Sequence, residues 1–375
     1  MPSKENNKLL HNLALSLFPN LGPNIFKTII NYCGSAEGFF NLSQGKAMKI
    51  PGIGPKLLAY RKGKDAYLKE ASNLIDAADK QGIEIHCYLE ANYPGRLKSV
   101  PDAPPFLFSK GNLNPNPKRT VGIVGTRNAT TYGRSITQKI TEELARFQPT
   151  VISGLAYGID IEAHRAAISN KIPTIAILGT DVNTIYPAAH KKTAEQMKEN
   201  GGLISEFKMG AALNPSNFPQ RNRIIAGLSD ALIVVEAARK GGALITAEIA
   251  YSYNREVFAV PGNLQSQYSE GCNNLIRSMK AGIYMGPGEI VESLSWDKEN
   301  DAATPAPTLT DTSDLDPMEL KVLERLYEKT EAEIDWLSRD LNIPIPQLAV
   351  KLLNLEFLGF VKAIPGKKYQ WTRPK

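Results

Sequence analysis

The stretch FPQRNRIIAGLSDALIVVEAARKGGALITAE, residues 218–248, decides the fold of this chain. Its continuous apolar run, Ala231–Val235, is typical of a strand that is buried on both faces. The run leads through Lys240-Gly241-Gly242 into a predicted helix, and such a glycine-rich turn lets backbone N–H groups approach an anion. Arg221 and Arg223 lie just upstream and can add bidentate contacts to phosphate. The stretch therefore predicts a phosphate-binding edge of an α/β sheet.

Five further apolar runs of strand length alternate with helix-length segments. They are residues 121–124, 151–153, 174–178, 203–205 and 257–260. Continuous apolar runs predict a parallel sheet with helices on both faces. Small and polar residues follow each run, so we expect a ligand at the carboxyl edge of this sheet.

A second turn at this edge is GIVGTRNATTYGRS, residues 122–135, which follows a strand and opens a helix as a phosphate-binding turn does. It matches neither the dinucleotide motif GxGxxG nor the triphosphate motif GxxxxGKS/T, so neither ligand is indicated. Gly125 marks the end of the strand, and Arg127 projects just beyond it. An arginine at this place can pair with phosphate or stack on a base.

A third turn, SGLAYGID at residues 153–160, follows the next strand. Ser153 and Gly154 are small enough for a ligand to approach the backbone, and Tyr157 offers an aromatic face for a base. Ordinary tight turns and solvated arginines are the alternative for each piece alone. Because glycines, arginines and an aromatic ring all gather at one edge, the sequence favours binding of phosphates and bases.

Catalytic groups are hard to assemble from this sequence. The four histidines lack the paired spacing of metal sites, so we predict no metal and no cofactor. Asp160 and His164 lie four residues apart on one predicted helix, and we expect Asp160 to cap helix amides and His164 to pack nearby. Glu206 and Glu236 follow strands, and we expect each to accept backbone or arginine hydrogen bonds rather than act as an acid or base.

The two ends of the chain have a different character. Residues 1–80 contain predicted short helices, and IPGIGPKLLAYRK at residues 50–62 fits a helix-hairpin-helix, which either holds a nucleic-acid backbone or only packs on its neighbour. Residues 297–314 are a predicted linker. Residues 315–375 contain three predicted helices and a basic hairpin at 361–371, the plan of a winged helix. A helical appendage for protein contacts is the alternative.

Composition limits the partners. The 375 residues include 44 Lys and Arg against 38 Asp and Glu, and six of these cations lie between residues 46 and 64 without an acid, which suits a polyanion. Cys33, Cys87 and Cys272 are widely spaced, so we expect no disulfide framework and a reducing, cytoplasmic location. No apolar run approaches membrane-spanning length, so no membrane partner is predicted.

Eight segments together resemble the DNA-processing protein A family, DprA or Smf. They are GIVGTR, VISGLAYGIDIEAH, TIAILG, IYP, FPQRNRIIAGLSDALIVVEA, ITAE, VFAVPG and SEGCNNLI. The resemblance implies an extended Rossmann-like core at residues 81–296, between an N-terminal helical domain of the helix-hairpin-helix or SAM-like type and a C-terminal winged helix. It also implies a homodimer without enzymatic activity that binds single-stranded DNA. Such a protein protects incoming DNA during natural transformation and helps to load the RecA recombinase.

The family's DNA-binding positions correspond here to Arg127, Ser153-Gly154, Arg221 and Arg223. Tyr157 departs from the family, because some relatives carry lysine there, and the turn at residues 240–242 replaces a commoner serine-glycine turn. The DNA-binding residues expected from the turns and the resemblance together are Gly125, Arg127, Ser153, Gly154, Tyr157, Arg221, Arg223, Lys240, Gly241 and Gly242.

Two further expectations concern the same core. Rossmann-like relatives that hydrolyse nucleoside monophosphates at the N-glycosidic bond carry the signature PGGxGTxxE, which GGALITAE at residues 241–248 matches in part. The third glycine is absent and Glu248 stands one residue too near Thr246, so a binding protein is favoured over a hydrolase. Ile283 and Met285 belong to an apolar run after the last predicted core helix, and we expect this run at a sheet edge that binds a second copy.

Overall fold

The computed structural model describes residues 4–296, 315–329, 331–358, 360–364 and 368–371. The chain divides into two compact units, Met1–Glu299 and Asn300–Lys375. The N-terminal helices and the α/β core, which we expected as separate domains with a boundary at residue 80, both belong to the first unit. The predicted linker at residues 297–314 lies outside the described residues. Within the described ranges, no helix is long and apolar enough to cross a membrane.

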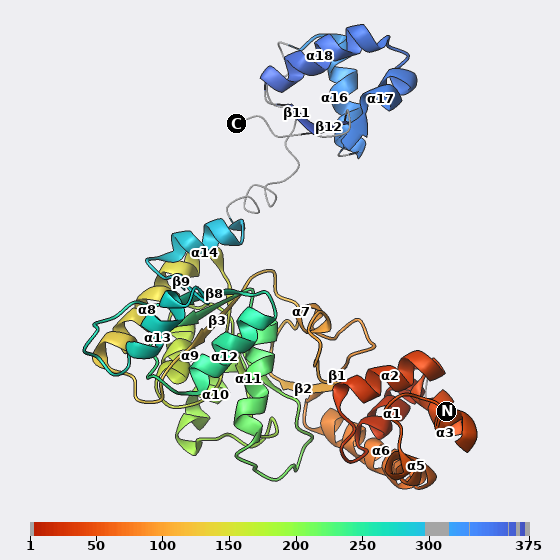
Figure 1. Ribbon diagram of the computed structural model, residues 1–375, viewed down its shortest axis with the longest axis vertical. Coiled ribbons are helices and arrows are strands. Elements are labelled where there is room, and N and C mark those ends of the chain that lie inside the picture. The colour runs from red at the N-terminus through yellow and green to blue at the C-terminus, as the bar shows by residue number, and fades with distance from the viewer. Residues whose placement is uncertain (1–3, 297–314, 330, 359, 365–367, 372–375) are drawn as a thin grey trace. The chain divides into compact units, whose positions relative to one another are not determined.

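In the part of the chain that the structure describes, the N-terminal part of the first unit consists of six helices, seen at one end of this unit in Figure 1. They are α1 (Lys4–Ser16), α2 (Pro23–Cys33), α3 (Ala36–Asn41), α4 (Gln44–Ala47), α5 (Pro55–Lys62) and α6 (Lys64–Lys80). The turn between α4 and α5 contains Gly52 at φ +82°, a conformation that favours glycine, so the predicted helix, hairpin and helix are present. Their apolar core continues into Cys87, Phe106 and Phe108 of the first two strands, which explains why these helices and the sheet form one unit.

Among the described residues of the first unit, nine strands form one sheet in the order β1-β2-β6-β5-β4-β3-β7-β8-β9. They are β1 (Glu84–Cys87), β2 (Phe106–Lys110), β3 (Thr120–Val124), β4 (Thr150–Ser153), β5 (Thr174–Ile177), β6 (Gly201–Ser205), β7 (Ala231–Val234), β8 (Glu256–Ala259) and β9 (Gly282–Ile283). Strands β3 to β9 pair in parallel, as the continuous apolar runs predicted. The antiparallel strands β1 and β2 at one edge were not predicted.

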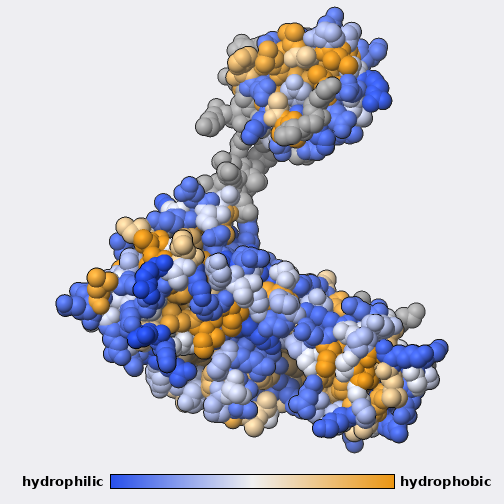
Figure 2. Space-filling model, viewed as in Figure 1, coloured by the Kyte–Doolittle hydropathy of each residue, from blue (hydrophilic) through white to orange (hydrophobic). Residues whose placement is uncertain are grey.

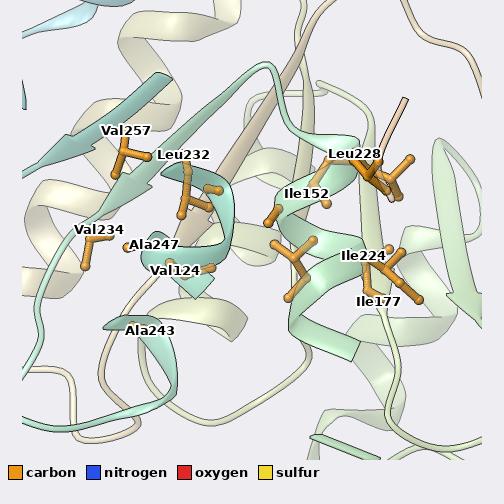
Figure 3. Close-up of a cluster of buried hydrophobic side chains, with 14 of the residues drawn as sticks. Val124, Ile152, Ile177, Ile224, Leu228, Leu232, Val234, Ala243, Ala247 and Val257 are labelled. Carbon is orange, nitrogen blue, oxygen red and sulfur yellow. The ribbon is translucent and has the colours of Figure 1, made fainter. Parts of the chain in front are cut away.

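Helices cover both faces of this sheet. They are α7 (Gly95–Lys98), α8 (Thr131–Leu144), α9 (Ile159–Ser169), α10 (Lys191–Met197), α11 (Asn217–Leu228), α12 (Gly242–Ser252), α13 (Glu270–Arg277) and α14 (Pro287–Ser293). On one face, Ile224 of α11 and Ala247 of α12 belong to the same apolar core as Val124 of β3 (Figure 3). Ile140 of α8 and Ile159 of α9 contribute to the core on the other face.

The strand order reverses at β3, and this reversal places the site. Strands β4, β5 and β6 follow on one side of β3, whereas β7, β8 and β9 lie on the other. In open parallel sheets, a crevice forms at the carboxyl ends of the strands where the order reverses. The turns after β3, β4 and β7 come from distant parts of the sequence and meet at this crevice.

The second unit is the predicted winged helix. It contains α16 (Pro317–Lys329), β10 (Glu331–Glu333), α17 (Ile334–Leu341), α18 (Ile345–Phe357), β11 (Val361–Ile364) and β12 (Lys368–Trp371), with the strand order β10-β12-β11. The Asp316 carboxylate accepts hydrogen bonds from the backbone N–H of Met318 and Glu319 at 2.8 and 2.9 Å and so caps the start of α16. The tip of the predicted hairpin, residues 365–367, lies outside the described residues.

Candidate nucleic-acid interface

A cavity of about 300 Å³ opens at the carboxyl edge of the sheet, where the order of the strands reverses. Its wall is formed by the turns after β3, β4 and β7 and by the first turns of α11 and α12. The ionisable side chains that line it are Arg127, Asp160, Arg221 and Lys240. Three cations and one carboxylate leave an excess of positive charge, so the cavity is suited to an anion.

The turn after β3 brings its backbone close to neighbouring elements at Gly125. A side chain there would lie 2.8 Å from Ile159 Cβ and 3.0 Å from the Glu236 carbonyl oxygen, so only glycine fits without a shift. Arg127 follows on the exposed part of the turn and makes no hydrogen bond or ion pair with another described residue. Its guanidinium group therefore stays available to a ligand.

The start of α8, however, already binds an anion from within the protein. The Glu236 carboxylate accepts hydrogen bonds from the Thr130 backbone N–H at 3.0 Å and from the Thr130 hydroxyl at 2.6 Å. A helix N-terminus favours negative charge, and Glu236 supplies that charge. The prediction that residues 122–135 offer this helix start to phosphate is therefore wrong, whereas the expected acceptor role of Glu236 is confirmed.

The start of α12 is open instead. Gly241 precedes the helix, and no side chain caps it. A side chain at Gly241 would meet no atom within 4 Å, and one at Gly242 would meet only Asn222 Nδ2 at 3.7 Å. The first backbone N–H groups of a helix have no partner within the helix, so those of α12 can bind an anion in the cavity. Lys240 is exposed beside them.

Arg221 lies on α11 and forms the floor of the cavity. The residue is 5% exposed, and its guanidinium donates hydrogen bonds to the Ile177 carbonyl and to Asn222 Oδ1. Its Nη2 atom lies 3.9 Å from Asp160 Oδ2. Burial raises the pKa of Asp160 and Arg221 opposes that rise, while burial lowers the pKa of Arg221. Arg221 is thus held in place by the protein before any ligand arrives.

Arg223 does not line this cavity. It forms an ion pair with Glu206 and donates a hydrogen bond to the Asp102 carbonyl. Residues two apart on a helix project to nearly opposite sides, so Arg221 and Arg223 cannot face the same ligand once α11 forms. Burial raises the pKa of Glu206 and the Arg223 charge opposes that rise, so Glu206 has the expected role of an arginine partner.

Ser153 and Gly154 support the site from inside. The Ser153 side chain is buried, and its hydroxyl donates to the Ile123 carbonyl at 2.6 Å, which leaves it no exposed surface for a ligand. A side chain at Gly154 would lie closer than 3.0 Å to both the Arg221 guanidinium and the Asp160 carboxylate. The Arg221–Asp160 pair therefore requires a glycine at position 154. Gly154 affects a ligand only indirectly, because it makes room for this pair.

A second cavity, of about 160 Å³, adjoins the first and is lined by aromatic rings. Tyr157 and Tyr186 are each 52% exposed, and the Tyr186 and Phe218 rings lie 5.4 Å apart between centroids. Arg127 and Arg221 line both cavities. Tyr157 was predicted from the turn in which it lies. Tyr186 and Phe218 come from other segments, and no motif in the sequence around them indicates that they line the same cavity.

The Asp160 and His164 pair has a structural role. His164 is buried between the Thr174 hydroxyl, 2.7 Å from Nδ1, and the Gly154 carbonyl, 2.5 Å from Nε2. Burial lowers the pKa of His164 to about 4. Asp160 pairs with Arg221, rather than capping α9 as we expected.

Comparison with known proteins settles the family. The model of the family described as DNA recombination-mediator protein A matches residues 84–295, which is more than half of the chain. The chain belongs to the DNA recombination-mediator protein A family. The DprA winged helix domain model matches residues 302–367.

Curated relatives of the DNA recombination-mediator protein A family cover most of the chain. The chain is 32% identical to Protein Smf of Synechocystis sp., over 96% of this chain and 97% of the relative. It is 36% identical to Protein Smf of Escherichia coli, with coverage of 73% and 74%. DNA processing protein DprA of Bacillus subtilis is 38% identical, with coverage of 61% and 77%. The chain is therefore a member of a family of DNA-processing proteins.

Two solved structures of the family share the fold. DNA processing protein A of Streptococcus pneumoniae is 31% identical, with a TM-score of 0.63 over 76% of this chain and 97% of that chain. DNA processing protein A of Helicobacter pylori is 28% identical, with a TM-score of 0.50 over 57% and 96%, and was solved for its single-stranded DNA binding mode. These matches confirm the predicted fold class.

The glutamate of the hydrolase signature lies outside the cavity. Both Glu248 carboxylate oxygens accept hydrogen bonds from Lys280, at 2.7 and 2.8 Å, and Glu248 lines neither cavity. A general acid or base must reach the scissile bond of a bound substrate. This arrangement gives no support to N-glycosidic hydrolysis. Among the described residues, no group of three or more His, Cys, Asp or Glu side chains could hold a metal ion.

Proposed function

We propose that this protein binds single-stranded DNA at the carboxyl edge of its sheet, with a phosphate in the polar cavity and a base in the aromatic one. The observation that carries the proposal is that the two cavities share Arg127 and Arg221. A nucleotide joins its phosphate to its base through one sugar, so adjoining phosphate and base sites fit this unit. The start of α12 and Lys240 complete the phosphate site.

The aromatic cavity favours an unpaired strand. Tyr157 and Tyr186 are half exposed, so their rings can stack on a base that is not already stacked and paired in a duplex. Stacking uses the face that every base has, and we therefore expect little dependence on sequence. The Helicobacter pylori relative, with its single-stranded DNA binding mode, supports the same ligand class.

The proposal predicts different effects for the two kinds of contact. With Arg127, Arg221 and Lys240 engaged, the logarithm of affinity should fall with the logarithm of salt with a slope near −2 per protomer, at about −0.7 per phosphate contact. Arg127→Ala should weaken binding and reduce the slope by about 0.7. Tyr157→Ala should weaken binding by about 1–3 kcal/mol and leave the slope unchanged, because stacking releases no counterions.

Fluorescence anisotropy of labelled single and double strands across salt concentrations tests this proposal. Arg146→Ala is the matched control, since this arginine stacks on Phe147 and lines neither cavity. Three results would contradict the assignment of the two cavities to single-stranded DNA. They are an affinity that does not change with salt, an equal affinity for duplex DNA, and a loss of affinity in Arg146→Ala equal to that in the cavity variants. Release of free base from nucleoside monophosphates would instead support the hydrolase alternative.

We further propose the cellular role that the family suggests, which is to protect incoming single strands in the cytoplasm during natural transformation and to help load the RecA recombinase, without enzymatic activity. The family description as a recombination mediator supports this role. In a RecA ATPase assay on strands coated with a competing single-strand-binding protein, the wild type should shorten the lag and Arg127→Ala should not. An unchanged lag with wild-type protein would count against recombinase loading.

A homodimer through the end of the sheet is part of the proposal. Strand β9 is the terminal strand, and Ile283 and Met285 are exposed there. An apolar strip beside an unpaired strand edge can bind the same strip of a second copy. Ile283→Arg should yield monomers in light scattering at micromolar concentration, and an unchanged dimer mass would place the interface elsewhere.

A further inference from the structure

The N-terminal helices carry a basic face that lines neither cavity of the sheet edge. Residues 43–64, which span α4, the hairpin turn and α5, contain six cations and no acid. The next helix differs, because residues 65–80 of α6 contain two lysines against four acids. Within residues 43–80, the positive charge is therefore concentrated in the hairpin. In Figure 2, hydrophilic side chains cover the end of the first unit where Figure 1 labels α5 and α6.

The apolar residues of the hairpin fix its position on the helices behind it. Ile50 before the turn and Leu57 and Leu58 after it are buried in the apolar core of the N-terminal helices. The lysines at positions 46, 49, 56 and 62 lie between and beside these residues and are exposed. Because the buried side chains occupy the inner side of the hairpin, packing holds the lysines together on its outer side.

Two of the six cations are used inside the protein, and four are not. Arg61 donates hydrogen bonds to the Phe39 and Leu42 carbonyls at 3.2 and 2.6 Å. Lys64 donates one to Asn41 Oδ1 at 3.3 Å. Within the described ranges, the other four make no hydrogen bond or ion pair: Lys46, Lys49, Lys56 and Lys62. Unpaired cations on one face repel one another, and a bound polyanion removes this repulsion.

Charge is the main means of binding that this face offers. Tyr60 is the one aromatic residue of residues 43–64, and its ring packs on Phe18 and Tyr67 with centroids 6.1 and 6.4 Å apart. Among residues 43–64, all of which the structure describes, Met48 is the only large apolar side chain that is well exposed. Partner proteins are bound mainly through buried aromatic and arginine anchors, and a membrane surface through apolar side chains that enter it beside the cations. The face therefore fits neither a protein partner nor a membrane.

We propose that the basic face of residues 43–64 binds the backbone of duplex DNA, as a second DNA surface besides the sheet edge. Binding by charge favours the polyanion with the highest charge density, and duplex DNA carries one charge per about 1.7 Å of its axis. Without an exposed ring, the face has nothing to stack on an unpaired base and gains nothing from a single strand. Contacts to backbone phosphates carry no sequence information, so the affinity does not depend on the duplex sequence. The proposal does not depend on single-strand binding at the sheet edge.

Fluorescence anisotropy of the full-length protein with a labelled duplex and a labelled single strand, across salt concentrations, tests this proposal. Lys49→Ala with Lys56→Ala removes two cations of the basic face. Lys69→Ala with Lys80→Ala removes two exposed lysines of α6 and is the matched control. Each phosphate contact to a duplex contributes about 0.9 to the salt slope, so the first variant should reduce the slope by about 2. Its duplex affinity near about 0.1 M salt should fall at least about tenfold, whereas the control should lose less than about threefold.

Two comparisons separate charge from fold and the basic face from the sheet edge. Lys49→Arg with Lys56→Arg should keep the duplex affinity within about threefold of wild type, because the contact depends on charge. Arg127→Ala should lower single-strand affinity and leave duplex affinity unchanged, and Lys49→Ala with Lys56→Ala should show the opposite pattern. If single strands do not bind but the duplex pattern holds, the assignment of the sheet edge fails and that of the basic face stands.

The proposal is overturned by any of three outcomes. One is a loss of duplex affinity in Lys49→Ala with Lys56→Ala that is no larger than in the control, including no duplex binding by any protein; a duplex that still binds then contacts another part of the chain. The second is an equal loss in the arginine variant. The third comes from sedimentation with vesicles of phosphatidylglycerol and phosphatidylcholine. If the alanine variant loses vesicle binding and keeps duplex binding, the face binds a membrane instead of DNA.

Discussion

Replacing Gly154 with alanine tests how the phosphate cavity is built. The added Cβ would lie closer than 3.0 Å to the Arg221 guanidinium and to the Asp160 carboxylate. Gly154 has no positive φ, so the change adds volume without demanding a new backbone conformation. Overpacking of this kind typically destabilises a protein by about 1–3 kcal/mol, and separating a buried ion pair adds to this. We expect a loss of at least about 2 kcal/mol in the free energy of unfolding.

The matched control is Gly241→Ala, where a Cβ would meet no atom within 4 Å and the backbone is extended. We expect the free energy of unfolding of this variant to stay within about 0.5 kcal/mol of wild type. Urea denaturation followed by Trp296 fluorescence, with Trp336 and Trp371 replaced by phenylalanine, reports the first unit alone. Single-strand affinity should fall for Gly154→Ala because Arg221 is displaced. Equal stability of the two variants, with normal DNA affinity for Gly154→Ala, would refute the packing argument.

Two further predictions concern buried charges. Arg223→Ala should lower the free energy of unfolding by about 3 kcal/mol near neutral pH, because it leaves Glu206 buried without its cation, yet the salt slope of DNA binding should not change. Burial raises the pKa of Glu206, so this loss should shrink as the pH falls and Glu206 becomes neutral; a reduced salt slope would contradict the placement of Arg223. Because His164 has its pKa lowered to about 4, the unfolded chain binds the proton first as the pH falls below about 6.5. The free energy of unfolding of the wild type should therefore drop by up to about 3 kcal/mol between pH 6.5 and 4. Urea denaturation of His164→Gln across this range should not show this drop.

The central sheet could be predicted from the sequence because a strand that is buried on both faces has a continuous run of apolar residues. Runs such as Ala231–Val235 and Thr174–Leu178 are apolar without alternation, and the structure has β7 and β5 at these places. The winged helix was predicted from three helix-length segments and a basic hairpin, which are local features of the sequence as well. Strands β1 and β2 were not predicted, because they are short and irregular segments flank them in the sequence. They join one edge of the sheet in antiparallel orientation.

The candidate site was only partly predictable. Glycines and an arginine after strands indicated the edge that binds a ligand, and Arg127 and the turn at residues 240–242 do line the cavity. The sequence could not show that Glu236 occupies the start of α8, because this residue comes from the end of another strand. It also could not show that Tyr186 and Phe218 share a cavity with Tyr157.

The sequence by itself determined which segments form helices or strands, and at which edge of the sheet the ligand-binding turns lie. Both depend on hydrophobic periodicity and turn residues, which act over a few neighbouring positions. The tertiary structure alone decided which side chains share a cavity. The sequence does not distinguish Arg221 from Arg223. Because both lie on α11, the helix directs Arg221 toward Asp160 and Arg223 toward Glu206. The direction of a side chain depends on the helix that holds it and on the partners that the fold brings near.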